Sequence, residues 1–192
     1  MKNLLFIMGI TINFMMFSIN SDELKIYKDH EDKKMEEQNL SEAFKNDSYS
    51  FALSLKYVDY EDKVAFKNEQ TAKQRLKNVQ KFLDELTDHG TSFHAVNNLE
   101  INDKWHKFVK DVAYLKYYGF DESEILNDLN VAGALILQAE NYYDKPSLNY
   151  LYQIFTDLNS AIHGEKVKYN VTRTFSQESQ FKKVSLYLDS KK

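Results

Sequence analysis

The chain has 192 residues, of which 43% are hydrophobic and 28% are charged, and its formal net charge at pH 7 is −4. This length fits one domain with an additional unstructured segment, and the apolar content is sufficient for a buried core. Five Gly and one Pro are few for a sheet with many tight turns, so the composition favours an all-α fold. The acidic balance argues against a nucleic-acid-binding protein, because phosphate recognition needs a basic surface.

The sequence contains no Cys, so disulfides, Cys-ligated zinc sites and thiol catalysis are excluded. The glycine-rich phosphate-binding motifs, the nucleophile elbow of α/β-hydrolases and the zinc-binding H-E-x-x-H motif are also absent. We therefore expect a protein without enzymatic activity, cofactor or metal.

The first 21 residues have the layout of a secretory signal peptide. Lys2 supplies a positive charge, an apolar run extends from Leu4 to Phe17, and polar residues follow up to Ser21. The apolar run is shorter than the roughly 20 residues that a membrane-spanning helix needs. We predict that the protein is exported and is periplasmic, surface-associated or secreted. There are two alternatives. The segment is an uncleaved anchor, which would be the only part of the protein in contact with a membrane, or it is an ordinary buried helix.

Residues 22–50 are predicted to form a charged flexible tether that precedes a helical domain at 51–192. Seven acidic residues and four lysines fall within 22–38, where apolar residues are too sparse to bury a helix face. The alternative is a recognition segment that folds on a partner. Residues 51–57 alternate in the manner of a strand, but no partner strand is evident nearby and we favour a helix.

Two helices are predicted next, from the spacing of apolar residues and from glycine stop signals. The first covers residues 60–89, and its seam repeats at four and three residues: Ala72, Leu76, Val79, Leu83 and Leu86. The second follows Asn102 and ends at Gly119, and its apolar face consists of Trp105, Phe108, Val109, Val112 and Leu115.

The third helix is predicted to lie at the centre of the bundle, because residues 131–137 are apolar nearly all round. It opens at Asp121, which has the spacing of a capping box with Glu124. Gly133 in its middle destabilises the helix by about 1 kcal/mol relative to Ala. We expect the close approach of another helix as the compensation.

The fourth helix begins around Pro146, in the first turn where Pro is favoured, and ends at Gly164. Its apolar face consists of Leu148, Leu151, Tyr152, Phe155, Leu158 and Ile162. After an extended link over 165–174, Phe181, Val184 and Leu188 return to helical spacing and predict a fifth helix. The predicted fold class is therefore all-α, a single bundle of about five helices.

Aromatic residues crowd the ends of the second and third predicted helices, which would lie at opposite ends of the bundle. Tyr is favoured in protein interfaces because it buries a large area at low entropic cost and keeps a polar tip. We therefore predict six candidate partner-binding residues: Tyr114, Tyr117, Tyr118, Phe120, Tyr142 and Tyr143. The alternative is that these rings only close the ends of the bundle.

With the export signal and the charged tether, two stretches of the chain resemble a known family. Residues 72–86 (AKQRLKNVQKFLDEL) and 107–129 (KFVKDVAYLKYYGFDESEILNDL) are similar to the helical surface lipoproteins of Borrelia-type spirochaetes, including the complement-regulator-acquiring group. The resemblance, over roughly 63–158, implies a non-enzymatic binder of host factors and transfers no site residues. The chain departs from this family in having no Cys to carry a lipid.

The sequence thus predicts an exported, non-enzymatic α-helical binding protein of the cell envelope or surface, which acts through protein–protein contacts, with host factors among the expected partners. The alternative is an immunity or inhibitor protein that neutralises a toxin or an enzyme in the cell envelope. A small, acidic, exported helical chain would fit that function too. A protein partner is expected in both cases, and nucleic acid in neither.

Overall fold

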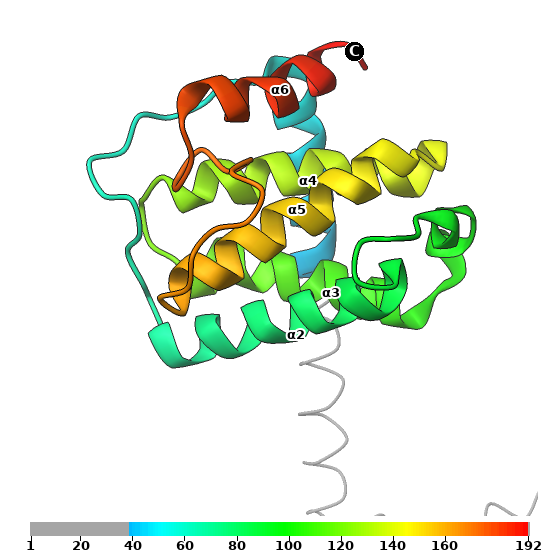
Figure 1. Cartoon of the computed structure of the whole chain (residues 1–192), viewed down its shortest axis with the longest axis horizontal. Helices are drawn as coiled ribbons and strands as arrows, with labels where there is room; N and C mark the ends of the chain where they lie inside the picture. Colours follow the sequence, from blue (N-terminus) through cyan, green and yellow to red (C-terminus); the bar gives the residue numbers. More distant parts are fainter. Residues whose placement is uncertain (1–38, 192) are drawn as a thin grey trace, which may run out of the picture. The chain divides into compact units, whose positions relative to one another are not determined.

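The computed structural model describes residues 39–191, and within this range the chain is all-α, as predicted (Figure 1). A helix over residues 39–54 comes first in the described range. It is followed by α2 (Glu69–Thr87), the 3₁₀ helix η1 (His94–Ile101), α3 (Asp103–Tyr114), the π-helical turn η2 (Leu115–Gly119), α4 (Ile125–Tyr142), α5 (Lys145–Ile162) and α6 (Glu178–Asp189). The predicted signal peptide at 1–21 and the first part of the predicted tether, 22–38, lie outside the described residues.

The helix over 39–54 corrects the prediction that the tether extends to residue 50. Its buried stripe is Phe44, Ser48 and Phe51, and Phe44 is only 1% exposed. One of the three buried positions is a Ser, so the sequence shows too few apolar residues on this face to indicate a packed helix. The favoured helix at 51–57 is present only to residue 54, because Leu55 has a positive φ of 47° and the chain is then extended.

The centre of the bundle is α4, whose residues from Val131 to Ile136 are all buried. A Cβ atom built on Gly133 would lie 2.1 Å from Ser48 Oγ and 3.1 Å from Phe44 Cζ. The predicted close approach of another helix at Gly133 is therefore confirmed, and the helix that makes it is the one over 39–54.

The apolar faces predicted for the other helices are confirmed, and the errors lie at the helix boundaries. All predicted face residues of α2, α3 with η2, and α5 are buried, except Leu86 and Ile162, which are half-buried. The first helix begins at Glu69 and not at residue 60, because the side chain of Asn68 accepts a hydrogen bond from the Thr71 N–H and caps it. The buried residues of α6 include Phe181, Val184 and Leu188, as predicted.

The N-terminus of α4 is capped by backbone and not by the predicted capping box. Asp121 Oδ1 accepts a hydrogen bond from the neighbouring Glu122 N–H. The N–H groups of Glu124 and Ile125 instead donate to the carbonyls of Asp62 (2.9 Å) and Lys63 (3.2 Å). The extended chain before α2 thus supplies the acceptors that the first turn of a helix lacks.

We expect Gly133→Ala to destabilise the protein, although Ala favours a helix over Gly by about 1 kcal/mol. The added methyl group would collide with Ser48, and overpacking of this kind lowers the free energy of unfolding by about 1–3 kcal/mol. Urea unfolding measures the change. The double variant with Ser48→Ala should recover part of the loss, because it removes the nearest atom. A Gly133→Ala protein more stable than the wild type would contradict the close approach.

Candidate functional site

The predicted aromatic cluster at the end of η2 serves mainly to hold the fold together. Phe120 is fully buried and packs on Phe66 with 5.1 Å between the ring centroids, so its prediction as a partner-binding residue is wrong. The Tyr117 hydroxyl donates to Asp47 Oδ2 at 2.5 Å and ties η2 to the helix over 39–54. Partial burial and this hydrogen bond raise the pKa of Tyr117.

Two tyrosines of the same cluster remain at the surface. The half-buried Tyr114 ring stacks on the guanidinium of Arg75, whose central carbon lies 3.9 Å from the ring centroid. Arg75 is itself held by an ion pair with the buried Asp111. Tyr118 lies beside Tyr114, with 5.5 Å between ring centroids, and is exposed. The surface at η2 therefore carries one exposed tyrosine, Tyr118, next to the Tyr114 ring that is stacked on Arg75.

The second predicted cluster is exposed at the other end of α4. Tyr142 is 71% exposed, and Tyr143 is 49% exposed and caps the helix with a positive φ of 52°. The turn between α4 and α5 lies beside η1, since Lys145 Nζ is 3.1 Å from His94 Nδ1. Figure 1 shows η1 and this turn at the same end of the bundle. The last residue of η1, Ile101, is 77% exposed. We call Ile101, Tyr142 and Tyr143 the exposed end surface.

A set of carboxylates that the sequence pattern does not reveal holds the loop after α5 and the helix α6. Asp157 of α5 is fully buried, and its two oxygens accept hydrogen bonds from the backbone N–H groups of Lys168, Tyr169 and Val171 at 2.8–3.0 Å. Three residues of loop backbone are thus fixed by one side chain. The only signal in the sequence is an acid inside the apolar face of a helix.

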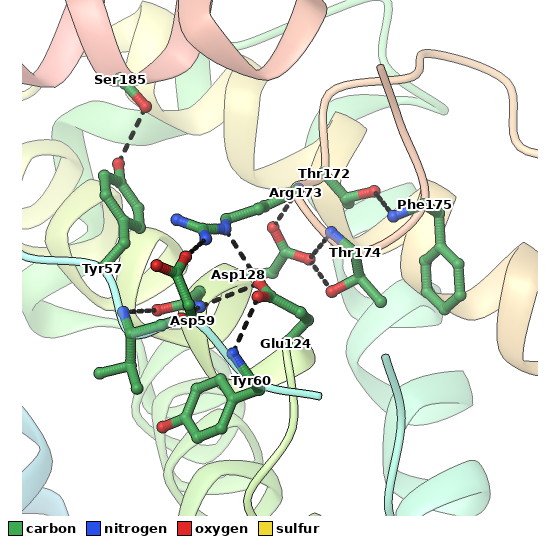
Figure 2. Close-up of polar contacts among 12 residues, drawn as sticks. Tyr57, Asp59, Tyr60, Glu124, Asp128, Thr172, Arg173, Thr174, Phe175 and Ser185 are labelled. Carbon is green, nitrogen blue, oxygen red and sulfur yellow. Dashed lines mark hydrogen bonds and ion pairs between the residues drawn. The ribbon is translucent and has the colours of Figure 1, made fainter. Parts of the chain in front are cut away.

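Asp128 of α4 holds the next part of the same loop (Figure 2). Its carboxylate is fully buried and accepts hydrogen bonds from the N–H groups of Arg173 (2.6 Å) and Thr174 (3.0 Å) and from the Thr174 hydroxyl (2.5 Å). Burial raises the pKa of Asp128 to about 6, and the negative charge of Glu124 one turn earlier acts in the same direction. The three hydrogen bonds oppose this shift.

The Arg173 side chain links the loop to the extended chain before α2. Its Nε lies 2.9 Å from Glu124 Oε2, and its Nη2 lies 2.5 Å from Asp59 Oδ1. Glu124 also accepts the Tyr60 N–H through Oε1. The Asn127 amide exchanges two hydrogen bonds with the backbone of residue 58. As Figure 2 shows, side chains of one α4 turn therefore fasten two segments that are far apart in the sequence.

Asp144, the N-cap of α5, anchors the end of α6. It accepts hydrogen bonds from the Ser147 N–H at 2.8 Å, the Lys191 ammonium at 2.8 Å and the Tyr187 hydroxyl. Burial alone would raise the pKa of Asp144, but hydrogen bonds from Lys191, Ser147 and Tyr187 lower it to about 2.

These carboxylates accept hydrogen bonds mostly from backbone N–H groups. Their role is therefore to hold the loop backbone in place, and few of their oxygens are left to bind a ligand. Within 39–191, no group of three His, Asp or Glu side chains is placed to hold a metal ion. None of the helices in this range is long and apolar enough to cross a membrane.

No protein-family model matches the chain, and neither a curated protein nor a solved structure shows significant similarity to it.

We expect the stability of the protein to depend on the titration of Asp128. Its folded pKa of about 6 lies above the ordinary value of 3.8 for an aspartate, so the folded state binds the proton more tightly. The stability that this group contributes is full below about pH 4 and is lost as the pH rises through about 6. Asp144 acts in the opposite direction, and its contribution is lost only as the pH falls below 4 towards about 2.

Urea unfolding of the wild type and of Asp128→Asn, measured from pH 4 to pH 7, tests this expectation. Asn cannot titrate, so the stability of the wild type relative to the variant should fall by about 1–3 kcal/mol as the pH rises over this window. Parallel stability curves for the two proteins would show that Asp128 keeps an ordinary pKa.

Proposed function

We propose that this chain is an exported, non-enzymatic α-helical protein of the cell envelope or surface that acts by binding another protein, with host factors among its partners. The observation that supports the proposal best is the exposed end surface. Its three large side chains are each about half to three quarters exposed. Export is supported by the signal-like pattern of residues 1–21, which precede the described range.

The composition of the exposed end surface suits a protein interface. Single exposed apolar residues are common, but here two tyrosines are adjacent in the chain and an isoleucine comes from an element at the same end. Tyrosines are enriched among the residues that dominate binding energies, because the ring is rigid and its hydroxyl can bond at the rim.

The exposed end surface is also held rigidly, which reduces the entropy lost on binding. The cap of α5 directly follows Tyr143, and Asp144 there is bonded to Ser147, Tyr187 and Lys191. The contact of Lys145 with His94 fixes the start of η1 against the same turn. A partner would therefore meet Tyr142 and Tyr143 next to a turn whose backbone is already ordered.

The proposal is tested by capture of partners on the immobilised chain without residues 1–21, from host serum and from an envelope extract of the source cell. The affinity of each identified partner is then measured for the wild type and for Tyr142→Ser. We expect Tyr142→Ser to weaken binding by about tenfold, the range of an interface residue that contributes more than about 1 kcal/mol.

Tyr49→Ser is the matched control, because Tyr49 is 61% exposed on the helix over 39–54. Equal affinities for the two variants would rule out the exposed end surface as the binding site. A captured partner that is a toxin or enzyme of the source cell's envelope, and is inhibited by the chain, would support the immunity function in place of host-factor binding.

A further inference from the structure

A groove of about 510 Å³ opens beside the Arg173 network, between the extended chain near Tyr57, the loop after Thr172 and α6. It is lined by Tyr57, Arg173, Ser176, Phe181, Lys182 and Ser185. Its volume falls in the range of small-molecule sites, about 300–1,000 Å³. None of these residues belongs to the exposed end surface.

The walls of the groove are aromatic and fixed. The rings of Tyr57 and Phe181 meet edge to face, with 5.3 Å between their centroids. The Tyr57 hydroxyl and Ser185 Oγ are hydrogen-bonded at 2.9 Å, as Figure 2 shows, so the tyrosine is held to α6. Phe181 is only 8% exposed, so the half-buried Tyr57 ring supplies most of the apolar surface against which a flat ring can pack.

Two cations flank this aromatic surface. The guanidinium carbon of Arg173 lies 5.2 Å from the centroid of the Tyr57 ring. Lys182 is exposed on α6, and the described residues include no ion-pair partner for it. The groove therefore combines an aromatic wall with a positively charged rim, the arrangement that recognises an anion with an apolar body.

The carboxylates that pair with Arg173 differ in how firmly they are held. Glu124 is mostly buried and is also bonded to Tyr60 and Asn127. The side chain of Asp59 is 97% exposed, and among the described residues it forms an ion pair with Arg173 alone. Exposed ion pairs contribute little to stability, so another carboxylate can replace Asp59 readily.

We propose that the groove binds a small organic monoanion that carries a carboxylate on an aromatic or apolar body. The carboxylate takes the place of Asp59 on Arg173 and lies within reach of Lys182, and the body packs on Tyr57 and Phe181. The exchange replaces one carboxylate on Arg173 by another, so the charge around the guanidinium is unchanged. A dianion would add a further negative charge near Glu124 and Asp128, which favours a carboxylate over a phosphate. This site goes beyond the proposed protein-binding function and does not depend on it.

Phenylacetate is the probe, and the test is a titration followed by backbone amide NMR on residues 39–191 within the full chain. Saturable shifts are expected at residues 57–59, 173–176 and 181–185. Phenylacetamide, which has the ring without the charge, and acetate, which has the charge without the ring, should each bind at least about tenfold more weakly.

Three variants identify the site. Asp59→Asn should tighten phenylacetate binding by about threefold, because the internal competitor loses its charge. Lys182→Gln should weaken it by about threefold, and Lys183→Gln, its exposed neighbour outside the groove lining, should leave it unchanged.

The proposal is overturned if phenylacetate gives no saturable shifts, if the shifts fall outside the groove, or if the two lysine variants behave alike. Weaker binding by Asp59→Asn would overturn the replacement of Asp59 by the ligand. None of these results bears on the exposed end surface, since Tyr142→Ser should bind phenylacetate as the wild type does.

Discussion

The position of the loop that leads into α6 depends on the three hydrogen bonds that the buried Asp128 carboxylate accepts from residues 173 and 174. Hydrogen bonds to a charged group contribute about 1.5–3 kcal/mol each, whereas a buried carboxylate without partners is strongly destabilising. If the loop moved away from α4, the Asp128 carboxylate would therefore lose its hydrogen bonds and would be either exposed to water or buried without a partner. Asp157 binds the preceding stretch and Asp144 holds the end of α6, so the loop and α6 are fastened to the central helices at successive points.

The same polar contacts separate the two surfaces that we connect with function. One turn of α4, with Glu124, Asn127 and Asp128, fastens the extended chain and the loop at the N-terminal end of the helix. The groove lies where these two segments meet α6. The exposed end surface lies at the C-terminal end of α4, which is 18 residues long. At 1.5 Å per residue, α4 spans about 27 Å from the polar contacts at its start to Tyr142 at its end.

The periodicity of apolar residues was enough to predict α2 to α6 and their buried faces, and Gly133 correctly indicated a close helix contact. Local sequence patterns give wrong predictions where a residue's hydrogen-bond or packing partner comes from a distant segment of the chain. The capping box at Asp121 and Glu124 is wrong because the carbonyls of Asp62 and Lys63 cap α4. The helix over 39–54 was hidden because its central buried residue is a Ser that faces a glycine. Phe120 was assigned to a surface because its burial depends on Phe66, more than 50 residues earlier.

The buried carboxylates could not be recognised from sequence for a related reason. Asp128 and Asp157 lie among apolar residues of amphipathic helices, and their partners are backbone N–H groups, which leave no mark in the sequence. The proposed exported protein has no Cys and therefore no disulfide to fix its long connections. A carboxylate that binds consecutive N–H groups fixes loop backbone as a crosslink would, and it does so in any redox environment. These connections would be insensitive to reduction but respond to pH, since the stability that Asp128 contributes is lost as the pH rises through about 6.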